Sequence, residues 1–137
     1  MSLLDALMRM DKGAFTHEET AEIKSRNLSK VLGEDVIVKV KGLDSEQYME
    51  LTALAIDKKG NTDYGKSYDS MALIIVEGMV EPNLKNAKLQ EHFGAATPKE
   101  LAKMFFKGTE LPEIAGKIGE LSGFGANAED QEEEIKN

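Results

Sequence analysis

Few residues in this 137-residue chain have the types and spacing needed for chemistry, and its two histidines are the first candidates. His17 is followed directly by Glu18 and Glu19, and a histidine beside carboxylates could contribute to a metal site. A structural metal site usually has about four ligands, mostly His or Cys, and nothing here supplies the third and fourth. We therefore predict that these three residues are solvated in a loop and bind no metal. His92 is predicted near the C-terminal end of a short helix, where a cation suits the helix dipole.

Sequence patterns for nucleophiles, phosphate loops and calcium loops are incomplete. Residues 121–125 match only half of a G-x-S-x-G motif. The glycines around them lie in or after a predicted helix, whereas a phosphate-binding loop follows a strand. Residues 60–63 lack the alternating ligands and the closing glutamate of a calcium loop. The sequence therefore predicts no catalytic residue, no cofactor and no metal ligand, and we do not expect an enzyme.

The charge of the chain argues against nucleic acid as a partner. The net charge is −8, and much of it comes from the acidic run between residues 129 and 134. Binding to a phosphate backbone requires clustered charge of the opposite sign. The acidic run is interpreted as a solvated tail, or alternatively as a segment that keeps an apolar binding surface soluble.

Composition and hydropathy indicate a single soluble domain. With 41% hydrophobic residues, a chain of this length can bury one core. No apolar run approaches the roughly 20 residues that span a bilayer, and the first residues lack the pattern of a signal peptide. There is no cysteine, hence no disulfide framework or thiolate chemistry. We expect a cytoplasmic protein that does not enter membranes.

The elements of the first half include two predicted strands. Residues 20–28 and 35–43 alternate apolar and charged side chains with period two, and the short join at 29–34 favours an antiparallel pair. Such a pair is marginal in water by itself, so it must pack on helices or on further strands.

Helices are predicted over most of the remaining chain. Asp44 is a predicted N-cap, and residues 58–66 are predicted to form a mobile loop. Residues 68–79 are apolar nearly all round; a strand is an alternative, but a buried central helix fits better, ended by the Glu-Pro-Asn at 81–83.

The C-terminal third contains the clearest helix signals. A short helix is predicted over residues 84–93, and Thr97 begins a capping box with proline at the next position. That helix is predicted to turn Leu101, Met104 and Phe105 inward. The last helix repeats apolar residues at helical spacing up to Leu121. From residue 124 onward, the glycine, alanine and acidic residues are predicted to remain disordered.

The sequence also predicts a short amphipathic helix near the start. Leu3, Leu4, Leu7 and Met8 recur at helical spacing. Either this helix docks on the core of its own domain, or it forms a detachable apolar arm that binds a partner protein. The predicted organisation is thus an N-terminal helical arm (1–12), a single globular α+β domain (13–123) with the strand pair packed on a mainly helical body, and a disordered acidic tail (124–137).

The order of several sequence fragments resembles the XkdN-like family of phage tail assembly chaperones. The fragments are residues 21–29, 36–43, 75–84 with a Glu-Pro-x-Leu turn, 93–101, 105–110 and 121–123. The resemblance covers roughly residues 18–123 and leaves the arm and the acidic tail outside. One departure is Thr109, which separates the Gly-Glu that the family usually shows before its last helix.

The resemblance implies a non-catalytic chaperone that keeps the tape measure protein soluble while tail tube subunits assemble around it. The implied partners are the tape measure protein and also the tail tube protein, and a homo-oligomer stays open. Such chaperones are absent from the finished virion, so proteomics of particles would separate this function from its alternative, a structural tail or connector component.

Many members of the family are made in two lengths by a ribosomal frameshift. If residues 135–137 are encoded by ATA, AAA and AAC or AAT, the message contains a slippery tract there. The hypothesis of such a tract rests on the resemblance and on the protein sequence Ile-Lys-Asn; the alternative is that these common residues stand there without any tract.

Overall fold

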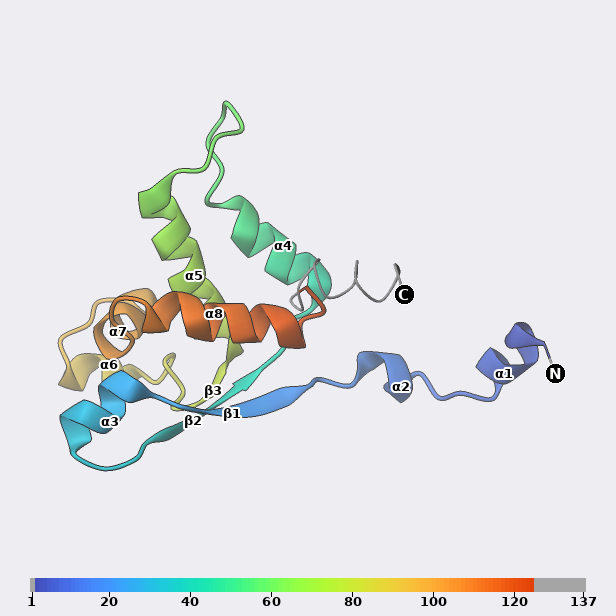
Figure 1. The fold of residues 1–137 in the computed structure, drawn as a ribbon, viewed down its shortest axis with the longest axis horizontal. Coiled ribbons are helices and arrows are strands. Elements are labelled where there is room, and N and C mark those ends of the chain that lie inside the picture. Colours follow the sequence, from blue (N-terminus) through green and yellow to red (C-terminus); the bar gives the residue numbers. More distant parts are fainter. Residues whose placement is uncertain (1, 125–137) are drawn as a thin grey trace, which may run out of the picture.

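A computed structural model describes residues 2–124 of the chain, and Figure 1 shows its eleven elements. The helices are α1 (Leu3–Met8), α2 (Gly13–Thr16), α3 (Arg26–Leu32), α4 (Ser45–Ala53), α5 (Tyr64–Gly78), α6 (Ala87–His92), α7 (Pro98–Phe105) and α8 (Glu110–Leu121). The strands are β1 (Thr20–Lys24), β2 (Ile37–Lys41) and β3 (Met79–Glu81). The fold is therefore mixed α+β, as predicted. No helix within residues 2–124 is long and apolar enough to cross a membrane.

The three strands form an antiparallel sheet in the order β1-β2-β3. Ile23 pairs with Val38 and Ala21 with Val40, which confirms the predicted antiparallel pair. Val38 and Val40 are completely buried, because their face of the sheet is covered by the helices of the body. The third strand, β3, was not predicted; Val40 pairs with Met79 there.

The prediction that residues 25–28 continue the first strand is wrong. The chain turns into α3 at Arg26, and Ser25 caps this helix by accepting the Leu28 N–H at 3.2 Å. The predicted join at 29–34 is thus largely helical. The carboxylate of Glu110, far away in the sequence, completes the cap by accepting the N–H groups of Arg26 and Asn27. The alternation of side chains along one segment cannot reveal a contribution from such a distant residue.

The buried central helix is confirmed as α5, but both of its ends differ from the prediction. It begins at Tyr64, inside the predicted loop, because Asp63 accepts the Lys66 N–H at 3.1 Å as an N-cap. It ends at Gly78 and leads directly into β3, so the chain is already extended before Pro82.

The C-terminal helices follow the prediction closely. Thr97 caps α7 by accepting the Glu100 N–H at 3.2 Å, while the Glu100 carboxylate accepts from the N–H of Ala96 at 2.8 Å. In α8, the predicted apolar positions Leu111, Ile114, Ala115 and Ile118 are buried, and Leu121 is half-buried. The prediction that Met104 faces inward is wrong, since its side chain is 38% exposed.

The boundary of the predicted tail is wrong by one residue. Phe124 stacks on Tyr48 with ring centroids 4.9 Å apart, and its N–H donates to the Gly119 carbonyl at 2.9 Å. The rest of the predicted tail, with the acidic run and the expected frameshift position at 135–137, lies outside the described residues.

We extend the name arm, predicted for residues 1–12, to residues 2–19. Its two helices lie apart from the sheet and its helices, and residues 15–19 join the arm to the body. Figure 1 shows α1 and α2 extending away from the sheet and from the helices that cover it. Neither helix of the arm contains a buried residue. The structure thus has α1 away from the core of its own domain.

Candidate functional site

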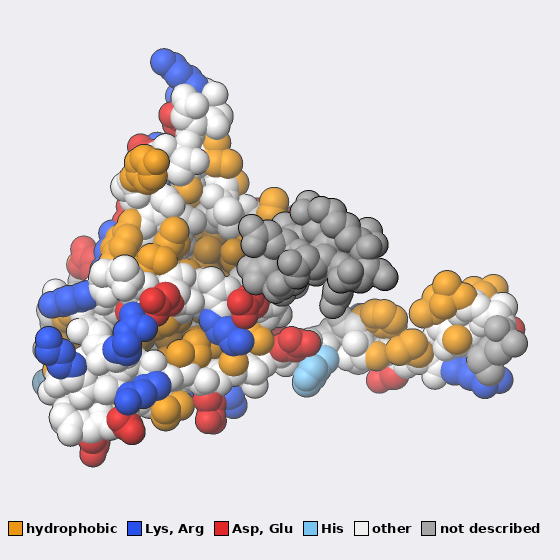
Figure 2. Space-filling model, in the orientation of Figure 1, with side chains coloured by type: hydrophobic (Ala, Val, Ile, Leu, Met, Phe, Trp, Pro, Cys, Tyr) orange, Lys and Arg blue, Asp and Glu red, His pale blue; other side chains and the backbone are white. Residues whose placement is uncertain are grey.

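The arm carries a dense set of exposed apolar side chains. The four predicted residues all lie on α1 with large exposed fractions: Leu3 74%, Leu4 68%, Leu7 44% and Met8 78%. Two residues that sequence reasoning missed join them: Met10, 50% exposed, and Phe15, 71% exposed. Figure 2 shows these apolar surfaces along the arm.

Local capping is what holds α1 in shape. The Ser2 hydroxyl accepts the Asp5 N–H at 3.1 Å, and the Asp5 carboxylate accepts the Ser2 N–H at 3.4 Å, which completes a capping box. A helix this short is marginal in water without tertiary packing. Because α1 has no such packing on its own body, a surface that covers its apolar side chains would stabilise it.

A second apolar surface is a groove in the body, which we call the groove. Its volume is about 490 Å³. Its apolar walls come from α3 and the start of β2, from Pro82, and from α6 and α7; they comprise Leu28, Val31, Leu32, Val36, Ile37, Pro82, Leu89, Phe93, Met104 and Phe105. Val31 and Leu32 are 74% and 63% exposed. Contiguous apolar surface of this kind is typical of protein-binding sites.

A buried carboxylate positions the wall formed by α3. Glu110 is only 4% exposed; it accepts from the Ser25 hydroxyl at 2.6 Å and from the N–H groups of Arg26 and Asn27 at 2.8 and 3.1 Å. A buried carboxylate is tolerated only when it is hydrogen-bonded in this way. The contact ties the start of α8 to the start of α3 across the sequence.

Two further contacts fix the same wall. The Asn27 amide donates to the Phe105 carbonyl at 2.6 Å, which joins α3 to the end of α7. The Arg26 guanidinium donates to the Glu113 carboxylate at 2.6 Å, and this hydrogen bond raises the pKa of Arg26 above its ordinary value. The groove therefore depends on contacts between residues far apart in the sequence, which explains why sequence reasoning missed it.

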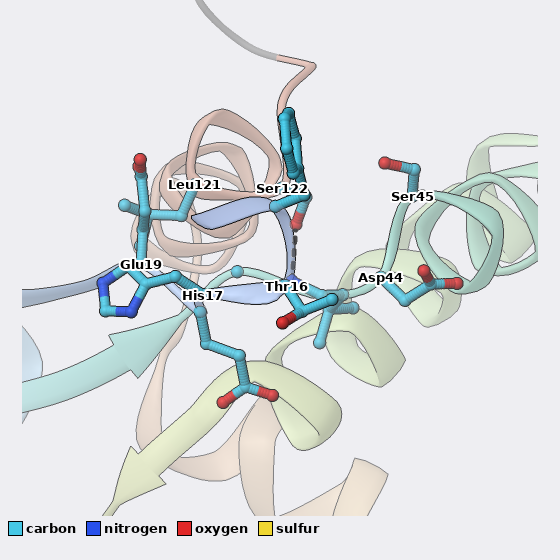
Figure 3. A pocket seen from close by; sticks show the side chains of 11 residues that line it. Thr16, His17, Glu19, Asp44, Ser45, Leu121 and Ser122 are labelled. Carbon is cyan, nitrogen blue, oxygen red and sulfur yellow. Dashed lines mark hydrogen bonds between the residues drawn. The ribbon is translucent and has the colours of Figure 1, made fainter. Parts of the chain in front are cut away.

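A polar hollow of about 350 Å³ lies where the arm joins the body (Figure 3). His17 and Glu19 line one side, and Asp44 and Ser122 come from the starts and ends of helices on the other. His17 is exposed in a segment without regular structure, as predicted. No group of three or more potential metal ligands occurs within residues 2–124.

The hydrogen bonds that cross this hollow are structural. The Leu43 N–H donates to the Ser122 hydroxyl at 2.8 Å, and that hydroxyl donates to the Ile118 carbonyl at 2.6 Å. The Gly42 N–H donates to the Glu19 carbonyl at 2.8 Å. These contacts tie the root of the arm and the start of α4 to the end of α8.

Nearly the whole chain is similar to a known protein family. A model of the phage XkdN-like tail assembly chaperone proteins matches residues 4–136. The chain belongs to this family. The resemblance stated from the sequence fragments is thereby confirmed.

The match also corrects the extent of the resemblance. The prediction that the arm and the acidic tail lie outside the XkdN-like family is wrong, because the match begins at Leu4 and ends at Lys136. Short amphipathic and acidic stretches contain few position-specific residues, so separate fragments do not reveal their membership. The apolar residues of the arm, from Leu4 onward, thus lie in a region shared with the family.

A solved structure shows a related fold. The crystal structure of the protein YqbN is 25% identical to this XkdN-like chain, over 77% of this chain and 87% of that one, with a TM-score of 0.52. A comparison with curated proteins finds no significant match.

Proposed function

We propose that this protein is a non-catalytic tail assembly chaperone that binds the tape measure protein through its arm and so assists assembly of the tail tube. The observation that carries the proposal is the set of six exposed apolar side chains on the arm of an XkdN-like family member. Leu3, Leu4, Leu7 and Met8 form the proposed contact surface, and Met10 and Phe15 extend it.

The physical basis is the removal of apolar surface from water on both partners. Covering one Leu or Met side chain contributes about 1.5–3 kcal/mol, so a few contacts hold an apolar stretch of an unassembled chain. The net charge of −8 keeps the carrier and its bound segment soluble. The arm supplies adhesion, and the net negative charge of the whole chain supplies solubility.

The polar hollow is lined by groups that hold the arm to the body. Its side chains and backbone groups are connected by hydrogen bonds that join the arm, β2 and α8. None of these bonds pairs a nucleophile with a general base, within the residues that the structure describes.

We place the protein's action in the host bacterial cytoplasm, before the virion is complete. Mass spectrometry of purified particles should therefore detect the tail proteins and lack this chain.

The test is capture of the tape measure protein by an arm-deleted variant. Deleting residues 2–11 should abolish most of the capture in a pull-down, because the contact surface is gone. The melting temperature should barely change, since α1 buries nothing on the body.

Point variants give a matched control. Leu4→Glu with Met8→Glu places charges on the arm and should weaken capture as the deletion does. Met49→Glu with Leu54→Glu changes two side chains of the body that are 53% and 51% exposed, and should leave capture intact. Unchanged capture by the arm variants, or a large loss of stability on deletion, would contradict the proposal.

A further inference from the structure

Within residues 2–124, the chain presents both an apolar helix that does not pack on its own body and an apolar groove at the surface of the body. We infer that the groove binds the arm of a second copy of this chain, so that two copies exchange their arms and form a homodimer. This inference concerns the free protein, before any client is present.

The two surfaces match in chemistry. The walls of the groove are aliphatic and aromatic, and the most exposed among them, Val31 and Leu32, lie on one helix. The arm offers Leu, Met and Phe side chains on and between two short helices. The Met side chains have several rotatable bonds and can fill an irregular groove. Docking would remove both apolar surfaces from water at once.

The direction of the arm favours exchange over folding back. In Figure 1, α1 lies at the opposite end of the molecule from α3, α6 and α7, which form the groove. The root of the arm is held by the hydrogen bond between Gly42 and Glu19, at the end of β1 that is farther from α3. Reaching its own groove would require the arm to reverse and run back along the whole of β1.

The buried area also favours a reciprocal contact. The six side chains of the arm expose on the order of 100 Å² each, about 600 Å² together, so one arm in one groove buries about 1,200 Å² on the two surfaces together. That is only the lower limit of the roughly 1,200–2,000 Å² that stable interfaces bury. Two reciprocal contacts bury about 2,400 Å², which is in the range typical of homodimers.

Charges on the two surfaces are complementary. Asp5 and Arg9 lie one turn apart on and just after α1. Lys107 and Glu81 line the groove from different elements. Within residues 2–124, none of the three side chains of Arg9, Lys107 and Glu81 forms an ion pair. In the inferred dimer, Asp5 faces Lys107 and Arg9 faces Glu81.

Sedimentation of the purified full-length chain tests the dimer directly. The wild type should show a concentration-dependent monomer–dimer equilibrium. Val31→Glu in the groove and Leu4→Glu in the arm should each weaken dimerisation about tenfold or more, because a charge enters an apolar contact. Met49→Glu, at an exposed position of α4 outside both surfaces, should leave the equilibrium unchanged.

Mixing the two disabled variants separates a specific exchange from general stickiness. One intact arm and one intact groove remain in a mixed pair, so the mixture should associate more strongly than either variant alone. The charge swap Asp5→Lys with Lys107→Asp should restore association that either single change weakens. A wild type that stays monomeric, or variants that dimerise like the wild type, would overturn the inference.

Cross-linking decides between exchange and folding back. The chain contains no cysteine, so Met8→Cys and Leu32→Cys can be introduced together and joined by a short bismaleimide. Exchange gives a covalent dimer, whereas folding back gives only a cross-linked monomer and refutes the exchange. The outcome is independent of the proposed client, because the tape measure protein is absent from the cross-linking reaction. If the protein is a monomer that still captures the tape measure protein, the inferred dimer is wrong and the proposed function stands.

Discussion

The body and the arm use the same apolar residue types in opposite ways. In the body, Leu101 and Leu111 are completely buried, whereas Leu3 and Leu4 in the arm are 74% and 68% exposed. The body's leucines contribute to folding because they leave water when the chain folds. The arm's leucines remain in water, so their contribution is available only to binding. The comparison predicts that equal substitutions in the two regions have separate consequences, stability in one and binding in the other.

The largest difference is expected between two leucine-to-alanine variants. Leu111→Ala leaves a cavity in the core and should lower the free energy of unfolding by about 2–5 kcal/mol. Leu4→Ala removes no packed contact and should change it by less than about 0.5 kcal/mol. Chemical denaturation measures both. Similar losses for the two variants would show that the arm packs on the body in solution.

The buried carboxylate should have the next largest effect. Glu110→Ala leaves the Ser25 hydroxyl and two backbone N–H groups of α3 without their acceptor and should cost about 2–3 kcal/mol. Glu113→Ala removes a carboxylate that is 53% exposed and should cost less than about 1 kcal/mol. The Glu110 variant should also loosen the α3 wall, with faster amide exchange at residues 26–28. Equal costs for the two variants would contradict the role given to Glu110.

Two glycines of the body should respond with opposite signs. A Cβ at Gly78 would lie 2.7 Å from the Ile118 side chain, so Gly78→Ala overpacks the contact of α5 with α8 and should cost about 1–3 kcal/mol. A Cβ at Gly116 would meet nothing within 4 Å, and Gly116→Ala should stabilise α8 by up to about 1 kcal/mol. Thermal unfolding distinguishes them. Two shifts of the same sign would show that the packing at Gly78 is looser than the structure has it.

The smallest effects concern two helix caps of the same kind. Thr97→Ala removes the acceptor of the Glu100 N–H and should cost about 1 kcal/mol, a few degrees in melting temperature. Ser2→Ala removes the matching cap of α1 and should leave the melting temperature unchanged, because the arm is outside the cooperative body. Its effect should appear only as a loss of helix signal from the arm. An unchanged melting temperature for Thr97→Ala would show that the predicted cap does not contribute.

The sequence by itself determined the elements whose signals are local. Apolar residues at helical spacing predicted α8, the Thr-Pro-Lys-Glu pattern predicted the start of α7, and Asp44 was correctly predicted as an N-cap. Alternation of apolar and charged residues predicted the pairing of β1 with β2. The amphipathic spacing on α1 predicted four of the six apolar side chains of the arm. In each case the stabilising contact joins residues within a few positions of one another, or repeats with a fixed period.

Only the tertiary structure decided the features that depend on distant residues. The strand predicted over residues 20–28 included residues 25–28, but Glu110 caps them into a helix from 85 positions away from Ser25. β3 is too short to be recognised without β2 beside it, and Phe124 is ordered because Tyr48 offers it an aromatic face. The groove exists because these distant contacts bring α3, α6 and α7 around Pro82. Local patterns record the free energy of local contacts, and the groove is built from contacts that only the folded chain makes.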